Sequence, residues 1–454
     1  MPKEAKITFY GGTGSVTGAN FLLEADGKKI LVDCGLTQGI KVADDVNWDL
    51  FAYNCEEIDL LFITHAHVDH LGRVPKLIEE GFKGKIYSTK PTRALAGPML
   101  EDTAGILAHS KTFKLDEIYS EENISTALSS WEGFDYHDKI QITPNLEVSF
   151  LNAGHILGSA MILFVYNGKK ILFTGDLGNS PSPILPDTEY ITEVDYLIME
   201  SVYGDRNHES RDDRRKFLEE AIEDNYKRKG VLIIPTFSLE RSQELLFELN
   251  ALVEEKRIPI MPIFLDSPLA IRLTEVFKQY REYFNEKAQH AMISDKHLFD
   301  FPGLHSTLHS DESRKINEVP NPKVIIAGSG MSSGGRVVHH EKRYLPDPNN
   351  TLLLLGYQSV GTPGRLIQEG LKTVRISGED VVVRSHVVTI SGYSGHKDSD
   401  GLLNFVQDLQ ENVKKIFVVM GEPKSSLFLV QKIRDNLGVE ASAPEEGDRV
   451  ILPC

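Results

Sequence analysis

Three histidines and an aspartate lie within six residues near the start of the chain. Residues 63–70 read Ile-Thr-His-Ala-His-Val-Asp-His and follow an apolar run. In an extended segment, side chains two residues apart project to one side, so His65 and His67 can reach one ion. The turn that follows presents Asp69 and His70 toward a second ion. Imidazole nitrogen and carboxylate oxygen suit Zn²⁺ or a similar first-row ion, so the segment predicts a site for two metal ions.

Three more candidate residues follow strand-like segments elsewhere. Residues 146–151 alternate apolar and polar side chains, as a half-buried strand does, and lead to His155. Residues 170–173 form a short apolar run that leads to Asp176, a candidate bridging ligand. A third apolar run leads to Asp33, which we expect to orient a ligating histidine from behind.

Five longer motifs accompany these ligands in the rest of the chain. They occupy residues 195–206, 235–244, 265–268, 328–336 and 391–396. Together with the ligand motifs, they resemble the beta-CASP nucleases of the metallo-beta-lactamase fold, from about residue 6 to the C-terminus. This group contains the polyadenylation-factor endonuclease and its prokaryotic relatives. The resemblance implies an α/β fold, a four-layer αββα metallo-beta-lactamase domain with an inserted α/β beta-CASP domain.

The resemblance also implies roles for the site residues. Six of them would hold two Zn²⁺ ions, namely His65, His67 and His155 for one ion, Asp69 and His70 for the other, and Asp176 as the bridge. Two ions about 3.5–4 Å apart can activate a water and neutralise the charge that builds on a phosphodiester. His396 matches the family's proton donor to the leaving oxygen, and Glu200 matches the carboxylate that supports it. Asp69 joins these two as a catalytic residue.

Two clusters of small and cationic residues offer contacts to substrate phosphates. Backbone N–H groups, hydroxyls, guanidinium groups and a helix N-terminus all favour an anion. A single glycine-serine loop is commonly just a turn. Two such clusters, however, predict a binding path for the phosphate backbone of a nucleic-acid strand. The expected contacts are Ser329, Gly330, Met331, Ser332, Ser333, Gly334 and Arg336 in a loop, and Ser238, Arg241 and Ser242 at a helix start. Arg365 is a further candidate, for which a structural salt bridge is an equally good interpretation.

One position departs from the family. In RNA-directed members, the strand after the 391–396 motif ends in His-Gly-Glu and its histidine completes the second metal site, whereas this chain has Met420 there. A thioether is a poor ligand for such an ion, so we expect a weaker second site. DNA-directed relatives also lack the histidine. Three functions stay open: an endonuclease of single-stranded RNA, with or without 5′-exonuclease activity; a DNA-directed nuclease; and an RNA-binding pseudoenzyme.

Length and composition limit the remaining alternatives. A chain of 454 residues predicts two or more compact units, which we place at 1–206 with 375–454 for the metallo-beta-lactamase domain and 207–374 for the insert. The three cysteines lack CxxC spacing, so they predict neither a disulfide framework nor a thiolate zinc site. No membrane-length apolar stretch or signal-peptide pattern occurs, and we expect a cytoplasmic protein that acts without a membrane. A monomer and a homodimer both stay open.

The charge of the chain argues against a broadly basic surface. The net charge is −17 at pH 7, whereas nucleic-acid-binding domains commonly carry a basic patch. We therefore expect nucleic acid to bind only in the active-site cleft.

Overall fold

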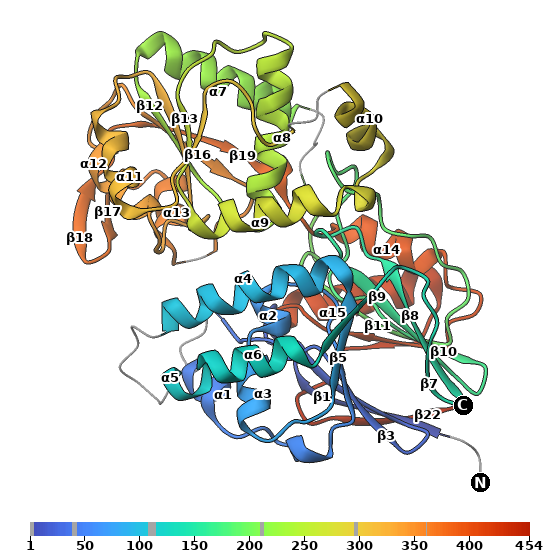
Figure 1. The fold of residues 1–454 in the computed structure, drawn as a ribbon. Coiled ribbons are helices and arrows are strands. Elements are labelled where there is room, and N and C mark those ends of the chain that lie inside the picture. Colours follow the sequence, from blue (N-terminus) through green and yellow to red (C-terminus); the bar gives the residue numbers. More distant parts are fainter. Residues whose placement is uncertain (1–3, 39–42, 108–114, 209–212, 295–297, 360) are drawn as a thin grey trace. The chain divides into compact units, whose positions relative to one another are not determined.

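The structure is a computed structural model that describes residues 4–38, 43–107, 115–208, 213–294, 298–359 and 361–454. The chain divides into two compact units, of which unit 1 comprises Met1–Asn207 and Gly395–Cys454, and unit 2 comprises His208–Ser394 (Figure 1). The insert thus ends later than the expected residue 374. The reason is that β19 (His386–Ile390) pairs in parallel with β16 (Thr351–Leu355), so the segment expected to return to the first domain still belongs to the sheet of unit 2.

Within its described residues, unit 1 contains two seven-stranded sheets. One sheet runs in the order β22-β1-β2-β3-β4-β5-β6 and the other in the order β21-β20-β11-β10-β9-β8-β7. The first sheet consists of β1 (Glu4–Gly11), β2 (Asn20–Ala25), β3 (Lys28–Val32), β4 (Leu60–Phe62), β5 (Lys85–Thr89), β6 (Trp131–Phe134) and β22 (Arg449–Pro453). The second consists of β7 (Ile140–Thr143), β8 (Leu146–Asn152), β9 (Ala160–Tyr166), β10 (Lys169–Phe173), β11 (Tyr196–Met199), β20 (Lys415–Val418) and β21 (Ala441–Ser442).

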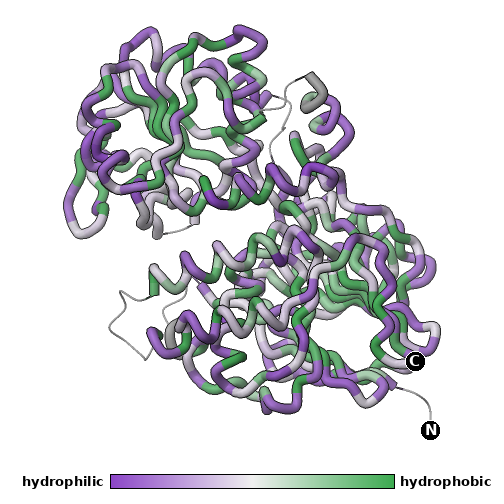
Figure 2. Tube along the Cα trace, in the orientation of Figure 1, coloured by the Kyte–Doolittle hydropathy of each residue, from purple (hydrophilic) through white to green (hydrophobic). Residues whose placement is uncertain are grey.

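The two sheets of unit 1 pack face to face through aromatic side chains. Phe9 of the first sheet lies 5.5 Å from Phe417 of the second, measured between ring centroids, and Phe62 lies 5.4 Å from Phe164. All four rings are buried, and burial of each stabilises the fold by about 1.5–3 kcal/mol. Figure 2 shows the hydrophobic residues concentrated along the strands.

Helices cover the outer faces of both sheets. Figure 1 shows α4 and α6 side by side over the first sheet, and α14 and α15 pack on the apolar outer face of the second. The expected four-layer αββα arrangement is confirmed. The helices of unit 1 are α1 (Ala43–Trp48), α2 (Val68–Leu71), α3 (Val74–Glu79), α4 (Lys90–Leu107), α5 (Leu115–Ile118), α6 (Glu121–Ser129), α14 (Ser399–Gln407) and α15 (Pro423–Leu437).

The described part of unit 2 contains a six-stranded parallel sheet in the order β14-β13-β15-β12-β16-β19. Its inner strands are apolar runs buried on both faces, as helix-covered parallel sheets require. The remaining strands are β12 (Val231–Pro235), β13 (Ile263–Leu265), β14 (Leu304–Ser306), β15 (Lys323–Ala327), and the hairpin β17 (Thr373–Ile376) and β18 (Glu379–Val382). The helices are α7 (Arg214–Arg228), α8 (Arg241–Glu254), α9 (Pro268–Gln279), α10 (Glu286–Ser294), α11 (Ser310–Lys315), α12 (Val337–Tyr344) and α13 (Pro363–Gln368).

Asp266, at the end of β13, anchors a buried polar network in unit 2. Its Oδ1 accepts hydrogen bonds from Arg336 Nη1 and Thr307 Oγ1, both at 2.7 Å. Its Oδ2 accepts from Ser313 Oγ at 2.6 Å and lies 2.7 Å from His340 Nε2. Burial alone would raise the pKa of Asp266, but these hydrogen bonds hold it well below the usual range.

Replacing Asp266 with alanine should destabilise the protein markedly. Arg336 and His340 would lose their buried carboxylate, and breaking such a pair costs about 3–5 kcal/mol. Because the pKa of Asp266 is depressed by folding, this contribution is full above about pH 4 and is lost as the pH falls below that value. Thermal unfolding at several pH values measures it. Asp311→Ala removes only an exposed ion pair with Lys315, so an equal loss in that control would contradict the prediction.

Candidate metal centre

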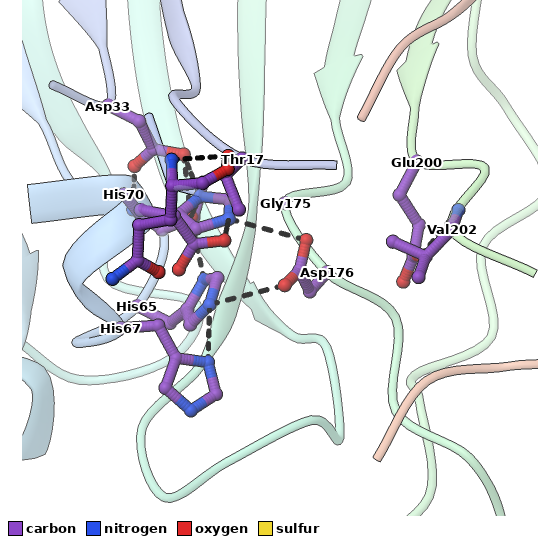
Figure 3. A network of polar contacts seen from close by, with 12 residues as sticks. Thr17, Asp33, His65, His67, His70, Gly175, Asp176, Glu200 and Val202 are labelled. Atoms are coloured by element: carbon purple, nitrogen blue, oxygen red, sulfur yellow. Dashed lines mark hydrogen bonds and ion pairs between the residues drawn. The ribbon is translucent and has the colours of Figure 1, made fainter. Parts of the chain in front are cut away.

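The ends of three strands in unit 1 bring the predicted ligands together. His65 and His67 follow β4, and Asp69 and His70 lie on the short helix α2 directly after them. His155 follows β8 and Asp176 follows β10 in the other sheet. Figure 3 shows the Asp176 carboxylate in contact with both His65 and His70.

Four of these side chains converge on one point. His67 Nδ1 lies 3.1 Å from His65 Nε2 and 3.2 Å from His155 Nε2. Asp176 Oδ2 lies 3.4 Å from His65 Nε2 and 3.6 Å from His155 Nε2. Tetrahedral zinc with bonds of about 2.0–2.1 Å separates neighbouring ligand atoms by about 3.3–3.4 Å. These four separations lie close to that spacing, and all four donor atoms lie within 4.8 Å of one another, so together they can hold one zinc-sized ion.

Hydrogen bonds behind the histidines point the correct nitrogens toward this ion. His155 Nδ1 lies 3.0 Å from the carbonyl oxygen of Gly395, so its N–H donates there and Nε2 keeps its lone pair. His65 Nδ1 lies 3.0 Å from Thr64 Oγ1, which itself donates to Asp33 at 2.8 Å. Burial lowers the pKa of all three candidate histidines of this group, which keeps them in the neutral form that binds metals.

A second group of donors lies on the other side of Asp176. His70 Nε2 is 3.4 Å from Asp176 Oδ1 and 3.9 Å from Asp69 Oδ2. Both His70 Nε2 and Asp176 Oδ1 are buried and have no hydrogen-bond partner, which is costly unless a further group pairs with them. A cation between these two atoms would satisfy both. The residues therefore fit a second ion, although with fewer donors than the first.

Asp33 lies directly behind His70. Its Oδ2 is 2.7 Å from His70 Nδ1, and its Oδ1 accepts the backbone N–H of Thr64 at 2.8 Å. This contact makes Nδ1 the protonated nitrogen and leaves the Nε2 lone pair directed at the second group. Asp33 thus occupies the orienting position that its sequence context predicts. Thr64, which contacts both Asp33 and His65, was not singled out, and its only sequence signal is that it directly precedes His65.

Met420 lies beside the second group but packs into the core. It is 2% exposed and lines a small cavity together with Asp33, His70 and Glu200. Its sulfur is so close to Gly12 that a Cβ added there would lie 2.6 Å away. The side chain thus fills space between the sheets, as a flexible thioether readily does.

His396 and Glu200 form a pair next to Asp176. His396 Nδ1 lies 3.3 Å from Glu200 Oε1 and 3.9 Å from Asp176 Oδ2. Glu200 Oε1 also accepts the backbone N–H of Leu177 at 2.6 Å, which fixes the carboxylate. Burial alone would lower the pKa of His396, but Glu200 and then Asp176 raise it to about 9. The contact with the Glu200 carboxylate therefore suits this imidazole to hold and donate a proton.

The predicted phosphate loop lies in unit 2, at the carboxyl end of β15. Many of its groups bond to one another: Ser329 Oγ accepts the N–H groups of Ser333 at 3.1 Å and Gly334 at 3.2 Å, and Ser332 donates to Glu341. The carbonyls of Gly330 and Met331 accept from Gln358 and Gly364, and Arg336 bonds to Asp266.

The second predicted cluster follows β12, the neighbouring strand in the same sheet, and its side chains also have internal partners. Ser238 Oγ lies 3.1 Å from Ser267 Oγ, Arg241 pairs with Glu244, and buried Ser242 donates to the carbonyl of Phe237. Arg365 Nε pairs with Glu369 at 2.7 Å, which is the structural salt bridge considered above. The structure thus brings the two clusters to adjacent strand ends, while their role in phosphate binding stays a prediction.

Comparison with known proteins identifies the class. The metallo-beta-lactamase superfamily model matches residues 15–228, the Beta-Casp domain model matches residues 242–367, and the model described as a Zn-dependent metallo-hydrolase RNA specificity domain matches residues 380–444. The chain belongs to the metallo-beta-lactamase superfamily, in the group whose members carry a Beta-Casp domain.

Several relatives match over nearly the whole chain. A ribonuclease from Thermus thermophilus is 36% identical over 98% of this chain and 99% of its own length. An RNase J-like protein from Methanocaldococcus jannaschii is 33% identical over 98% and 99% of the two chains. A transcription termination factor from Methanosarcina mazei is 31% identical over 96% of this chain and 70% of its own.

One solved structure, a protein of unknown function from Enterococcus faecalis V583, matches with a TM-score of 0.60 and 12% identity. It covers 99% of this chain and 100% of its own, and this likeness shows the fold alone. In the part of the chain that the structure describes, no helix is long and apolar enough to span a membrane.

Proposed function

We propose that this protein is a metal-dependent nuclease that cleaves phosphodiester bonds of single-stranded RNA. The observation that carries the proposal is the convergence of His65, His67, His155 and Asp176 on one point beside the His396–Glu200 pair. The name ribonuclease of a relative that aligns along nearly the whole chain supports RNA as the substrate. The donor set suits two Zn²⁺ ions, one in each group around Asp176.

The side chains of the centre have distinct tasks in this proposal. When bound, Zn²⁺ supplies a Lewis acid and lowers the pKa of a water. His396 donates a proton to the leaving oxygen, and Glu200 accepts its Nδ1–H and holds the ring in place. Asp33 keeps His70 oriented from behind.

The two clusters of unit 2 fit a phosphate-binding role by their place in the sheet. From β12 the chain continues to β13, which lies toward one edge of the sheet. From the adjacent β15 it continues to β16, which lies toward the opposite edge. The place where the chain changes direction in this way is a topological switch point, and open α/β sheets bind their ligands there, outside the carboxyl ends of the strands. We propose that Ser238 and Ser329 contact the RNA backbone there, whereas Arg241 and Arg336 would first have to exchange their carboxylate partners.

Cleavage of matched oligonucleotides tests the proposed substrate. An end-labelled single-stranded RNA and a DNA of the same sequence are incubated with zinc-loaded protein, and the products are separated by size. Faster cleavage of RNA is expected, with internal products revealing endonuclease action and stepwise shortening revealing 5′-exonuclease action. Faster cleavage of DNA would favour the second candidate, a DNA-directed nuclease, for which Met420 beside His70 is the supporting observation. Cleavage of neither would contradict both.

Met420 should make the second ion easier to remove than the first. The first group has four converging donors, whereas the second has His70, Asp69 and Asp176 with a thioether beside them. Dialysis against a mild chelator followed by metal analysis should therefore give one retained ion per protein in the wild type. Met420→His should retain more metal, because a histidine that lines the same cavity as His70 offers the second ion a nitrogen donor.

The matched control for this test is Met420→Leu, which keeps the apolar volume and adds no ligand. Equal retention of both ions in the wild type, with no change in Met420→His, would contradict the prediction and show that another residue completes the second group.

A further inference from the structure

The segment after Glu200 leaves β11 in a tight, well-fixed turn. The N–H of Gly204 donates to the carbonyl of Ser201 at 3.0 Å, and the N–H of Arg206 donates to the carbonyl of Tyr203 at 3.2 Å. A Cβ added to Gly204 would lie 2.6 Å from the carbonyl oxygen of Ser425, so only glycine fits there. The turn therefore holds Tyr203 and Arg206 in a set position relative to Glu200.

Two aromatic contacts extend this turn to the candidate active site. The ring of Tyr203 is buried, and its centroid lies 6.1 Å from that of His396 at an interplanar angle of 43°. The guanidinium carbon of Arg206 lies 4.8 Å from the Tyr203 ring centroid. The three side chains thus follow one another in the order His396, Tyr203, Arg206.

The charge of Arg206 is anchored but reaches solvent. Its Nη1 lies 3.2 Å from Asp205 Oδ1, and its carbonyl oxygen accepts the N–H of Ser399 at 3.0 Å. Its side chain is nevertheless 45% exposed. Lys424 pairs with the other oxygen of the same carboxylate at 2.9 Å, but this lysine is 84% exposed and belongs to helix α15. Asp205 therefore pairs with two cations, and Arg206 is the one that stacks on Tyr203, whose ring in turn lies next to His396.

We propose that Arg206 binds a phosphate of the substrate strand next to the one that is cleaved, and that Tyr203 is a positioning residue for it. The inference rests on the proposed nuclease function and names a further contact of that site. A guanidinium presents a planar fork that matches a phosphate in two hydrogen bonds. On a chain of net charge −17, a fixed cation one aromatic ring away from the proton donor supplies the local attraction that a polyanion needs.

The salt dependence of RNA cleavage tests the role of Arg206. For Arg206→Ala we expect kcat/KM to fall about tenfold, mainly through KM, because a charge-assisted hydrogen bond contributes roughly this much. The slope of log kcat/KM against log salt concentration should become shallower by about 0.7, the value for one phosphate contact on a single strand. Arg206→Lys should keep the slope but recover only part of the affinity, since it retains the charge without the fork.

Lys424→Ala is the matched control, because it removes the other cation from Asp205. Its kcat/KM and salt slope should equal those of the wild type. Equal losses in both variants, or an unchanged slope in Arg206→Ala, would overturn the assignment. If the wild type cleaves no RNA, the proposed function itself fails; if it cleaves and Arg206→Ala is unchanged, only this inference fails.

Variants of Tyr203 test its positioning role separately. Tyr203→Phe keeps the ring, so its KM should rise less than that of Tyr203→Ala. Tyr203→Ala should raise KM as Arg206→Ala does, while metal content stays unchanged. The double variant Tyr203→Ala with Arg206→Ala should be no worse than Arg206→Ala alone, because the ring acts through the guanidinium. Equal rises in KM for Tyr203→Phe and Tyr203→Ala, or full additivity in the double variant, would contradict the role.

Discussion

Replacing His67 with alanine should abolish bound metal and RNA cleavage together. His67 Nδ1 lies 3.1 Å and 3.2 Å from the Nε2 atoms of His65 and His155, so it is the donor around which the first group is built. Loss of a ligating imidazole leaves three donors for an ion that prefers four in a closed site. Metal analysis and a cleavage assay on the same purified sample measure both effects.

The matched control for His67→Ala is His137→Ala in the same unit. His137 has a side chain that is 62% exposed and lies 3.4 Å from Glu189, away from the candidate ligands. Its removal should leave metal content and cleavage unchanged. Full metal occupancy in His67→Ala would show that this residue is not a ligand.

Replacing His396 with alanine should retain metal yet slow cleavage. His396 lies beside Asp176 but outside the four converging donors, so the first ion keeps its ligands. Loss of a positioned proton donor lowers the rate by on the order of 10²–10⁴. Single-turnover cleavage of RNA measures the loss, and metal analysis checks occupancy. Loss of metal would instead reassign His396 as a ligand.

A substrate with a better leaving group separates the proton-donor role from a structural one. A p-nitrophenyl phosphodiester expels a phenolate that needs no proton, so His396→Ala should lose far less activity on it than on RNA. Glu200→Gln should follow the same pattern with a smaller loss, because the histidine stays but its carboxylate partner is neutralised. Equal losses on both substrates would contradict proton donation.

The proximity of His65 and His67 could be predicted from sequence because strand geometry is regular. Side chains two residues apart share one side of an extended segment, and this places His65 and His67 together without knowledge of the fold. The contacts behind the ligands could not be predicted in this way. His155 is oriented by the carbonyl of Gly395, a residue 240 positions away, and such a backbone contact leaves no residue-type signal.

The end of the insert and the partners of the phosphate clusters show a second limit of prediction from sequence, because both depend on contacts made in the fold. The composition of β19 fits a strand in either unit, and only its pairing with β16 assigns it to unit 2. Arg336 and Arg241 look like phosphate ligands in sequence, whereas their carboxylate partners Asp266 and Glu244 appear only in the fold; their role in phosphate binding stays a prediction. Arg206 ends the 195–206 motif, but its stack on Tyr203 is visible only in the fold.

We infer that the metal centre of unit 1 performs the cleavage. The most direct test removes metal from the wild type with a strong chelator, returns Zn²⁺ in steps, and measures bound zinc and RNA cleavage on each sample. We expect no cleavage by metal-free protein and a return of activity as zinc binds. Undiminished cleavage by protein shown to contain no metal would contradict it.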